Sequence, residues 1–202
     1  MKNLKLNADS HSDNNNTTNL DFYDEVLTKD LSANKAVQPS PLLKLFKDEL
    51  KDIYWAEKAM IKVLPELIKS ATSGELADAL TNHLAETKNQ VIRIKQVFES
   101  IDKKASTRKC KAIEGLIKEA QGIIEDCEPG AMCDAGIISA VQKIEHYEIA
   151  TYGTLRQFAE TLGLYKVVNL LLTTLNEEKA ADEKLTIIAV AAINMEAAEA
   201  EA

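Results

Sequence analysis

Hydrophobic residues recur every three or four positions along most of this chain, the spacing that predicts amphipathic helices. Four long segments carry the pattern, at about residues 41–70, 75–101, 134–162 and 165–193. A weaker amphipathic segment covers residues 109–125, inside a long connection between the second and third helices. No segment alternates in the way a strand would. The pattern therefore predicts an all-α fold of four long helices, with a fifth in the connection.

Residues at the ends of these segments predict how the helices are joined. Ser40 is suited to cap the first helix, with Pro41 at its first position, and Gly163 is suited to end the third helix. Residues 72–74 form a short loop between the first two helices. Two hairpins joined by a long crossover predict a ferritin-like four-helix bundle made of two antiparallel hairpins. The helix 109–125 would span about 26 Å, and we expect it to bring the second hairpin back to the end from which the first one starts.

Composition predicts three regions along the chain. Residues 1–38 are mostly polar, with a low-complexity stretch at 14–18, and we expect a disordered N-terminal tail. Residues 39–195 would form the bundle. Residues 196–202 lose the hydrophobic stripe, and we expect them to be a frayed C-terminal tail.

The two hairpins repeat one pattern, and the repeat places acids on core-facing stripes. At an offset of 91, the first and third helices align as Leu50 with Val141, Ile53 with Ile144, Glu57 with Glu148 and Leu64 with Leu155. At an offset of 92, the second and fourth helices align as Leu76 with Val168, Leu80 with Leu172, Glu86 with Glu178, Gln90 with Asp182 and Ile101 with Ile193. An unpaired buried carboxylate is costly, so acids in these positions require a neutralising partner.

The two aligned acids of each hairpin are a similar number of residues apart, which would bring all four acids to one layer of the core. The polar residues expected to face this layer are Glu57, His83, Glu86, Glu145, Glu148, Glu178 and Asp182. Carboxylates with one or two imidazoles suit iron or manganese, and two bridged ions would fit the charge. Two alternatives stay open, because single acids could lie at helix edges beside Lys or Arg, and His83 could be an ordinary core histidine. His146 falls on the far side of its helix, and we interpret it as peripheral.

Charge and cysteine content narrow the class of protein. The net charge of −8 argues against nucleic-acid binding, which relies on basic patches. Cys110, Cys127 and Cys133 are an odd number and form no CxxC pair, which favours thiols in a reducing compartment over a disulfide scaffold. The chain offers neither the hydrophobic run of a signal peptide nor a membrane span. We therefore expect a cytoplasmic protein with no membrane partner.

Several stretches resemble the YciF/YciE family, which are ferritin-like bacterial proteins associated with stress responses. The matching stretches are Asp48–Lys58, His83–Lys88, Lys109–Leu116, Lys143–Leu155 and Glu177–Leu185, within about residues 40–190. The resemblance implies a ferritin-like bundle, a proposed di-metal centre and a tendency to form homodimers. Ferritins, rubrerythrins and manganese catalases carry Glu-x-x-His motifs, whereas here Asn89 follows Glu86 and Ala181 follows Glu178 at that spacing. We therefore expect a more carboxylate-rich centre than theirs.

Three functions remain open at this point. The first is a redox-active protein with two iron or manganese ions that consumes dioxygen or hydrogen peroxide in a stressed cell, in which case it would be an oxidoreductase. Tyr54, Tyr147 and Tyr152 could supply an electron or a hydrogen bond there, although each also suits a structural role. The second is a stress protein that binds metal or a partner without turnover. The third is a purely structural bundle whose acids are solvated.

Overall fold

The computed structural model describes residues 39–199, so the expected tail at 1–38 and residues 200–202 lie outside the described residues. The described region contains helices and no strands, which confirms the all-α prediction. The helices are α2 (Pro41–Ser70), α3 (Gly74–Ser100), α4 (Lys111–Asp126), α5 (Ala131–Thr161), α6 (Tyr165–Ile188), the π-helix η1 (Ala189–Ile193) and α7 (Asn194–Glu199).

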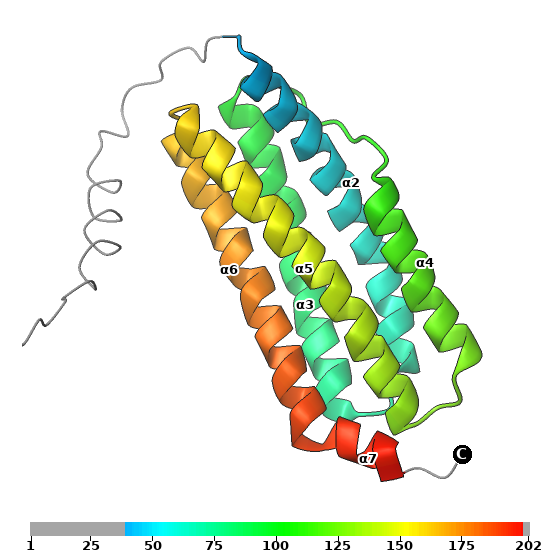
Figure 1. Ribbon diagram of the computed structural model, residues 1–202. Coiled ribbons are helices and arrows are strands. Elements are labelled where there is room, and N and C mark those ends of the chain that lie inside the picture. The colour runs from blue at the N-terminus through cyan, green and yellow to red at the C-terminus, as the bar shows by residue number, and fades with distance from the viewer. Residues whose placement is uncertain (1–38, 200–202) are drawn as a thin grey trace, which may run out of the picture. The chain divides into compact units, whose positions relative to one another are not determined.

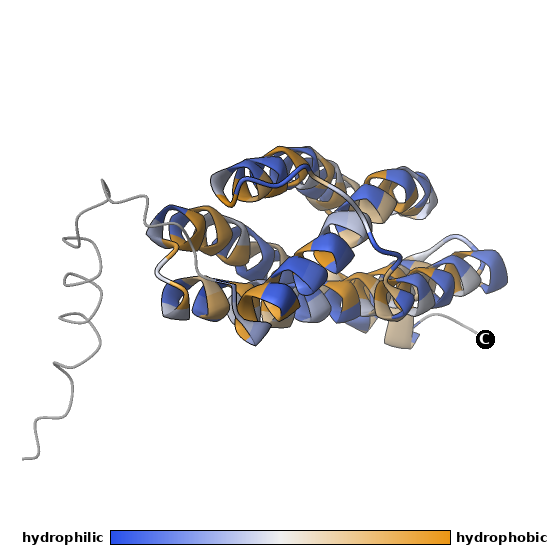
Figure 2. Ribbon diagram, turned by 90° about the horizontal axis from the view of Figure 1, so that it is seen from above, coloured by the Kyte–Doolittle hydropathy of each residue, from blue (hydrophilic) through white to orange (hydrophobic). Residues whose placement is uncertain are grey.

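Helices α2, α3, α6 and α5 form a four-helix bundle in that order around its core (Figure 1). Each of the four packs against two neighbours, and α4 lies outside against α2 and α5. Each helix carries a hydrophobic and a hydrophilic side, as the sequence pattern predicts (Figure 2). The core therefore lies between the four long helices, at the place where the predicted acids would meet.

The crossover carries the chain to the opposite end of the bundle from the one that we expected. Asp134, near the start of α5, accepts hydrogen bonds from Thr72 N (2.8 Å), Thr72 Oγ1 (2.6 Å) and Ser73 N (2.8 Å), in the turn between α2 and α3. An antiparallel hairpin returns the chain to its starting end, so a crossover along the bundle must deliver it to the other end. The second hairpin therefore starts where the first one turns, and the sequence-based expectation was wrong on this point.

Local signals in the sequence fix several helix ends and one close contact. Ser40 Oγ accepts a hydrogen bond from Leu43 N at 3.1 Å, which caps α2 as predicted. Gly163, which follows α5, has a φ of 72°, a conformation that favours glycine. A Cβ atom on Gly136 would lie 2.7 Å from the Ile123 side chain, so glycine allows α4 and α5 to approach each other closely.

Helical structure continues past the predicted end of the bundle. After η1, α7 extends to Glu199 and contacts α5 (Figure 1). Residues 196–199, expected to fray, are thus helical. The hydrophobic stripe ends before them, and no residue of α7 is buried.

The cysteines do not all remain thiols. Cys127 and Cys133 form a disulfide between the C-terminal end of α4 and the start of α5, with Cα atoms 5.4 Å apart. The expectation of three thiols was therefore wrong. Sequence spacing does not reveal that the turn after α4 folds these two residues together. Cys110 is free and buried, with its Sγ 3.1 Å from the hydroxyl of Tyr147.

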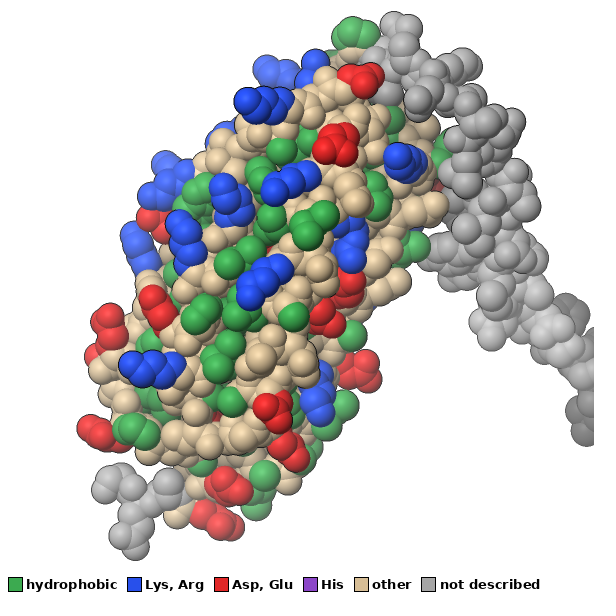
Figure 3. Space-filling view, turned by 180° about the vertical axis from the view of Figure 1, so that it is seen from behind, with side chains coloured by type: hydrophobic (Ala, Val, Ile, Leu, Met, Phe, Trp, Pro, Cys, Tyr) green, Lys and Arg blue, Asp and Glu red, His purple; other side chains and the backbone are tan. Residues whose placement is uncertain are grey.

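Charged side chains are not spread evenly over the surface. On the face shown in Figure 3, Lys and Arg predominate over the upper part, while acidic side chains become more frequent toward the lower end. Within residues 39–199, no helix is both long enough and hydrophobic enough to cross a membrane.

Candidate metal centre

Residues that the offset of 91 aligns between α2 and α5 are buried to the same extent. Ile53 and Ile144 are both fully buried, and Glu57 and Glu148 are each only 1% exposed. Both acids occupy the middle of a hydrophobic stripe, in agreement with the offset of 91. The two carboxylates therefore lie in the core.

The offset of 92 between α3 and α6 does not describe the burial of these helices. The side chain of Glu86 is 45% exposed, whereas its supposed counterpart Glu178 is fully buried. The offset of 91 instead relates Leu80 to Leu171 and Thr87 to Glu178, and all four are at most 1% exposed. The two offsets differ by one residue, which corresponds to a rotation of about 100° around the helix axis. An alignment that is wrong by one residue therefore pairs a core position with an edge position.

Four buried side chains from three helices converge in the core. Ligand atoms of His83 (α3), Glu145 and Glu148 (α5) and Glu178 (α6) all lie within 4.8 Å of one another. Glu57 (α2) is buried beside them, and the charges of His83 and Glu145 act on its carboxyl group. The four helices of the bundle thus contribute four carboxylates and one imidazole to this carboxylate–histidine group.

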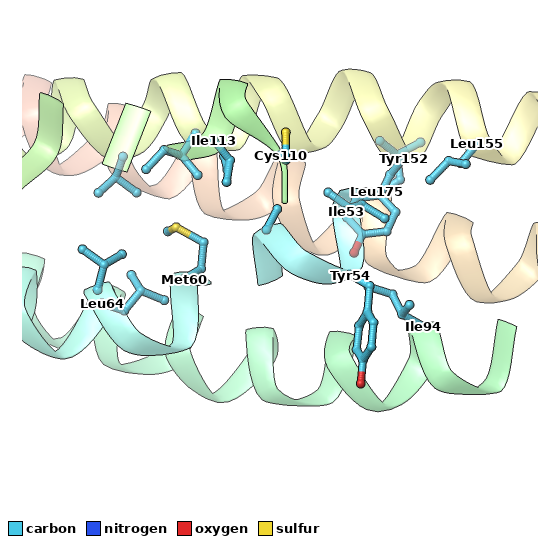
Figure 4. Packing of buried hydrophobic residues seen from close by; sticks show 14 of the residues in the cluster. Ile53, Tyr54, Met60, Leu64, Ile94, Cys110, Ile113, Tyr152, Leu155 and Leu175 are labelled. Carbon is cyan, nitrogen blue, oxygen red and sulfur yellow. The ribbon is translucent and has the colours of Figure 1, made fainter. Parts of the chain in front are cut away.

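Few hydrogen bonds satisfy this group. Tyr152 projects from α5 into the core near Ile53 and Leu175 (Figure 4). Its hydroxyl donates a hydrogen bond to the Glu57 carboxylate. His83 Nε2 lies 3.1 Å from Glu145 Oε1, although neither atom has a hydrogen bond of good geometry. Within the described residues, the buried side-chain polar atoms without a hydrogen-bond partner belong to Glu57, His83, Gln90, Glu145, Glu148 and Glu178. Such a concentration of unsatisfied polar atoms requires an explanation.

Burial and mutual repulsion raise the pKa values of Glu57, Glu148 and Glu178. Desolvation raises the pKa of Glu57 to about 8, although the hydrogen bond from Tyr152 and the charge of His83 oppose this shift. Desolvation, followed by the charges of neighbouring carboxylates, raises the pKa of Glu148 and of Glu178 well above the usual range. Burial alone would lower the pKa of His83, but Glu145 beside it raises the value. Without a cation, the group must therefore hold protons.

Two of the predicted site residues lie outside the group. Glu86 is at its edge, with Oε2 3.9 Å from His83 Nδ1. Asp182 is partly exposed, accepts a hydrogen bond from Gln142 Nε2 at 3.0 Å, and lies 3.3 Å from the exposed His146. The structure thus brings together Glu57, His83, Glu145, Glu148 and Glu178, and places His146 on the periphery as predicted. The buried acids also contradict the idea of a bundle whose acids are solvated.

Sequence reasoning missed a polar network beside the group. Arg93 donates two hydrogen bonds of 2.8 Å to Glu177 and one of 2.6 Å to Thr174, while Gln90 Nε2 donates to Glu177 at 3.2 Å. Glu177 precedes Glu178, and its charge also acts on Glu57. The helical spacing could have placed Gln90 on the buried stripe of α3, because the buried residue Ile94 follows it by four residues.

The donor set fits hard or borderline metal ions. Four carboxylates and one imidazole suit iron or manganese, whereas a structural zinc site would normally contain thiolates. Eight unpartnered atoms on the five side chains leave ample capacity for ligation. The negative charge of the group also favours metal ions, because cations would remove the repulsion that otherwise forces protons onto these acids.

Comparisons with known proteins agree with this architecture. A family model described as a domain of unknown function, DUF892, matches residues 41–198. The protein YciF of Escherichia coli (strain K12) is 47% identical over 149 residues, which is 73% of this chain and 90% of YciF. The crystal structure of the E. coli stress protein YciF matches with a TM-score of 0.74 and 44% identity, covering 77% of this chain and 99% of that one.

A second solved structure is similarly close. It is that of YcfI from Rhodopseudomonas palustris, whose description proposes a structural protein, and it matches with a TM-score of 0.70 and 44% identity. The match covers 76% of this chain and 97% of that one. The chain therefore belongs to the DUF892 family, in agreement with its resemblance to YciF and YciE.

Proposed function

We propose that this protein binds two iron or manganese ions in the carboxylate–histidine group and acts on dioxygen or hydrogen peroxide under stress. The unsatisfied buried atoms of Glu57, His83, Glu145, Glu148 and Glu178 carry the proposal. A folded bundle gains nothing from burying so many acids without partners, whereas cations would neutralise them. Membership in a family that includes a stress protein supports the physiological setting.

The chain's own residues would prepare the site for this chemistry. The five proposed ligands are at most 5% exposed, so the bundle keeps bulk water away from them. Tyr152 donates to Glu57 and thereby fixes the orientation of this carboxylate. Iron or manganese bound here would supply redox chemistry toward oxygen species. Asn89 and Ala181 stand where the Glu-x-x-His motifs of ferritins, rubrerythrins and manganese catalases place histidine, so we do not transfer ferroxidase or catalase activity to the protein.

Anaerobic loading with Fe(II), followed by exposure to oxygen, tests this proposal. The wild-type protein should retain iron and oxidise it, with a rise in near-UV absorbance. Glu148→Gln should lose most of the retained iron, because the amide removes a negative charge from the centre of the group. Glu119→Gln is a matched control, since Glu119 is 59% exposed and pairs with Lys143 on the surface. A wild-type protein that retains no iron and no manganese would contradict the proposal.

A second candidate function is metal or partner binding without turnover. The description of YcfI as a proposed structural protein supports a role without turnover. Stoichiometric binding of iron or manganese without consumption of oxygen or peroxide would identify this function. Formation of a homodimer is also a proposal, and sedimentation equilibrium of the full chain would test it.

A further inference from the structure

A cavity of about 350 Å³ leads from the surface to the carboxylate–histidine group. It lies between α3 and α6, and residues of α5 also line it. Two of its lining residues, His83 and Glu145, are 5% and 0% exposed and carry polar atoms that have no hydrogen-bond partner. The cavity therefore reaches two side chains of the proposed metal centre.

Small residues create this opening. Ala79 on α3 faces it, and Ala180 and Ala181 of α6 line the same space. Side chains between packed helices normally fill such gaps to near-crystalline density. Larger residues at these three positions would close the cavity without altering any proposed ligand.

The outer part of the cavity is acidic. Glu75, Asp78 and Glu86 line it from α3, and Lys184 is the basic residue among its lining side chains. Glu86 is 45% exposed, and its Oε2 lies 3.9 Å from His83 Nδ1. A concave surface with an excess of one charge raises the local concentration of counter-ions. Glu86 thus connects the solvent-exposed acids to the buried imidazole.

Two other surface cavities, of about 450 and 470 Å³, do not have these properties. One is lined by residues around Trp55 and Lys58, and the other by residues around Cys127 and Cys133. Neither contains any of the five proposed ligands. Among these cavities, only the one between α3 and α6 joins solvent to the centre.

We propose that the cavity between α3 and α6 is the path by which divalent cations reach the buried centre, with Glu86 as the carboxylate that passes them to His83. This inference rests on the proposed function, and it gives Glu86 a role in transfer rather than in the final site. It also explains why Glu86, which the sequence pattern associates with the centre, lies at the edge of the carboxylate–histidine group in the structure.

The rate of cobalt(II) binding to metal-free protein tests the path. Stopped-flow absorbance of the bound ion gives the association rate, and the end point gives the amount bound. Ala181→Leu should slow association by at least about tenfold because it narrows the cavity. Glu86→Gln should slow it by about two- to fivefold and reduce its dependence on salt, because one steering charge is lost. Both variants should reach the wild-type end point.

Ala59→Leu is the matched control, since Ala59 lines the cavity around Trp55, which reaches no proposed ligand. It should bind cobalt(II) at the wild-type rate. If Ala181→Leu does not fold, Glu86→Gln still decides the question, because it changes a partly exposed side chain. Wild-type rates in both cavity variants, with a normal end point, would overturn the path alone. A wild-type protein that binds no cobalt(II), iron or manganese would instead overturn the proposed function and the path together.

Discussion

The stability of the metal-free protein should fall as the pH rises from 5 to 9. Burial raises the pKa of Glu57 from 4.5 to about 8, so the folded protein holds a proton that the unfolded chain releases. The stabilisation is fully present below pH 4.5 and is lost as the pH rises through about 8. Glu148, Glu178 and His83, whose pKa values are also raised, act in the same direction.

The size of this effect follows from the shift at Glu57 alone. At about 1.4 kcal/mol per pKa unit, a change from 4.5 to about 8 corresponds to roughly 5 kcal/mol. Typical domains are stable by only about 5–15 kcal/mol. The metal-free bundle should therefore be markedly weaker at pH 9 than at pH 5. A metal ion should reverse the trend, because ligands bind it in their deprotonated forms.

Urea unfolding of metal-free protein at several pH values, followed by circular dichroism, measures this dependence. Glu57→Gln is the informative variant, since it keeps an acceptor for the Tyr152 hydroxyl but cannot ionise. It should show a flatter dependence of the unfolding free energy on pH. Wild-type stability that is constant or increases from pH 5 to 9 would refute the account of a protonated core group.

Three further predictions concern contacts between the helices of the bundle. Asp134→Ala should lower the free energy of unfolding by about 2–4 kcal/mol, because a buried carboxylate with three hydrogen bonds is lost, and urea titration measures this. Gly136→Ala should cost about 1–3 kcal/mol through the contact with Ile123, visible as a lower melting temperature; an unchanged value would show that α4 moves away freely. Arg93→Met should cost about 1–3 kcal/mol because Glu177 loses its charged partner and keeps only the hydrogen bond from Gln90, and a double variant with Glu177→Gln should recover part of that loss.

The helices could be predicted from the sequence because their local signals agree with their packing. Pro41 and Ser70 bound α2 as expected, and Gly163 ends the third long helix in the predicted conformation. Helix α5 begins at Ala131, before the predicted start at about residue 134, because Gly130 precedes it without a side-chain cap that would mark its first residue. The direction of the crossover depends on long-range contacts such as that between Asp134 and Thr72, which no local pattern contains.

The centre could be predicted only in part. Glu57 and Glu148 have hydrophobic neighbours on both sides along their stripes, so periodicity alone places them in the core. Glu86 and Glu178 align at an offset that differs from the correct one by a single residue. Both offsets match hydrophobic residues to hydrophobic residues, so the sequence does not distinguish them, although they differ by about 100° around the helix. Glu145 has no acidic counterpart in the repeat, and its burial follows from the packing of three helices.

Anomalous diffraction from crystals of metal-loaded protein tests the central claim most directly. Data collected above and below the absorption edge of iron or manganese would locate the ions without assumptions about their ligands. About two anomalous peaks should lie between Glu57, His83, Glu145, Glu148 and Glu178. Peaks confined to surface acids, or less than about a tenth of an equivalent of bound metal, would contradict it.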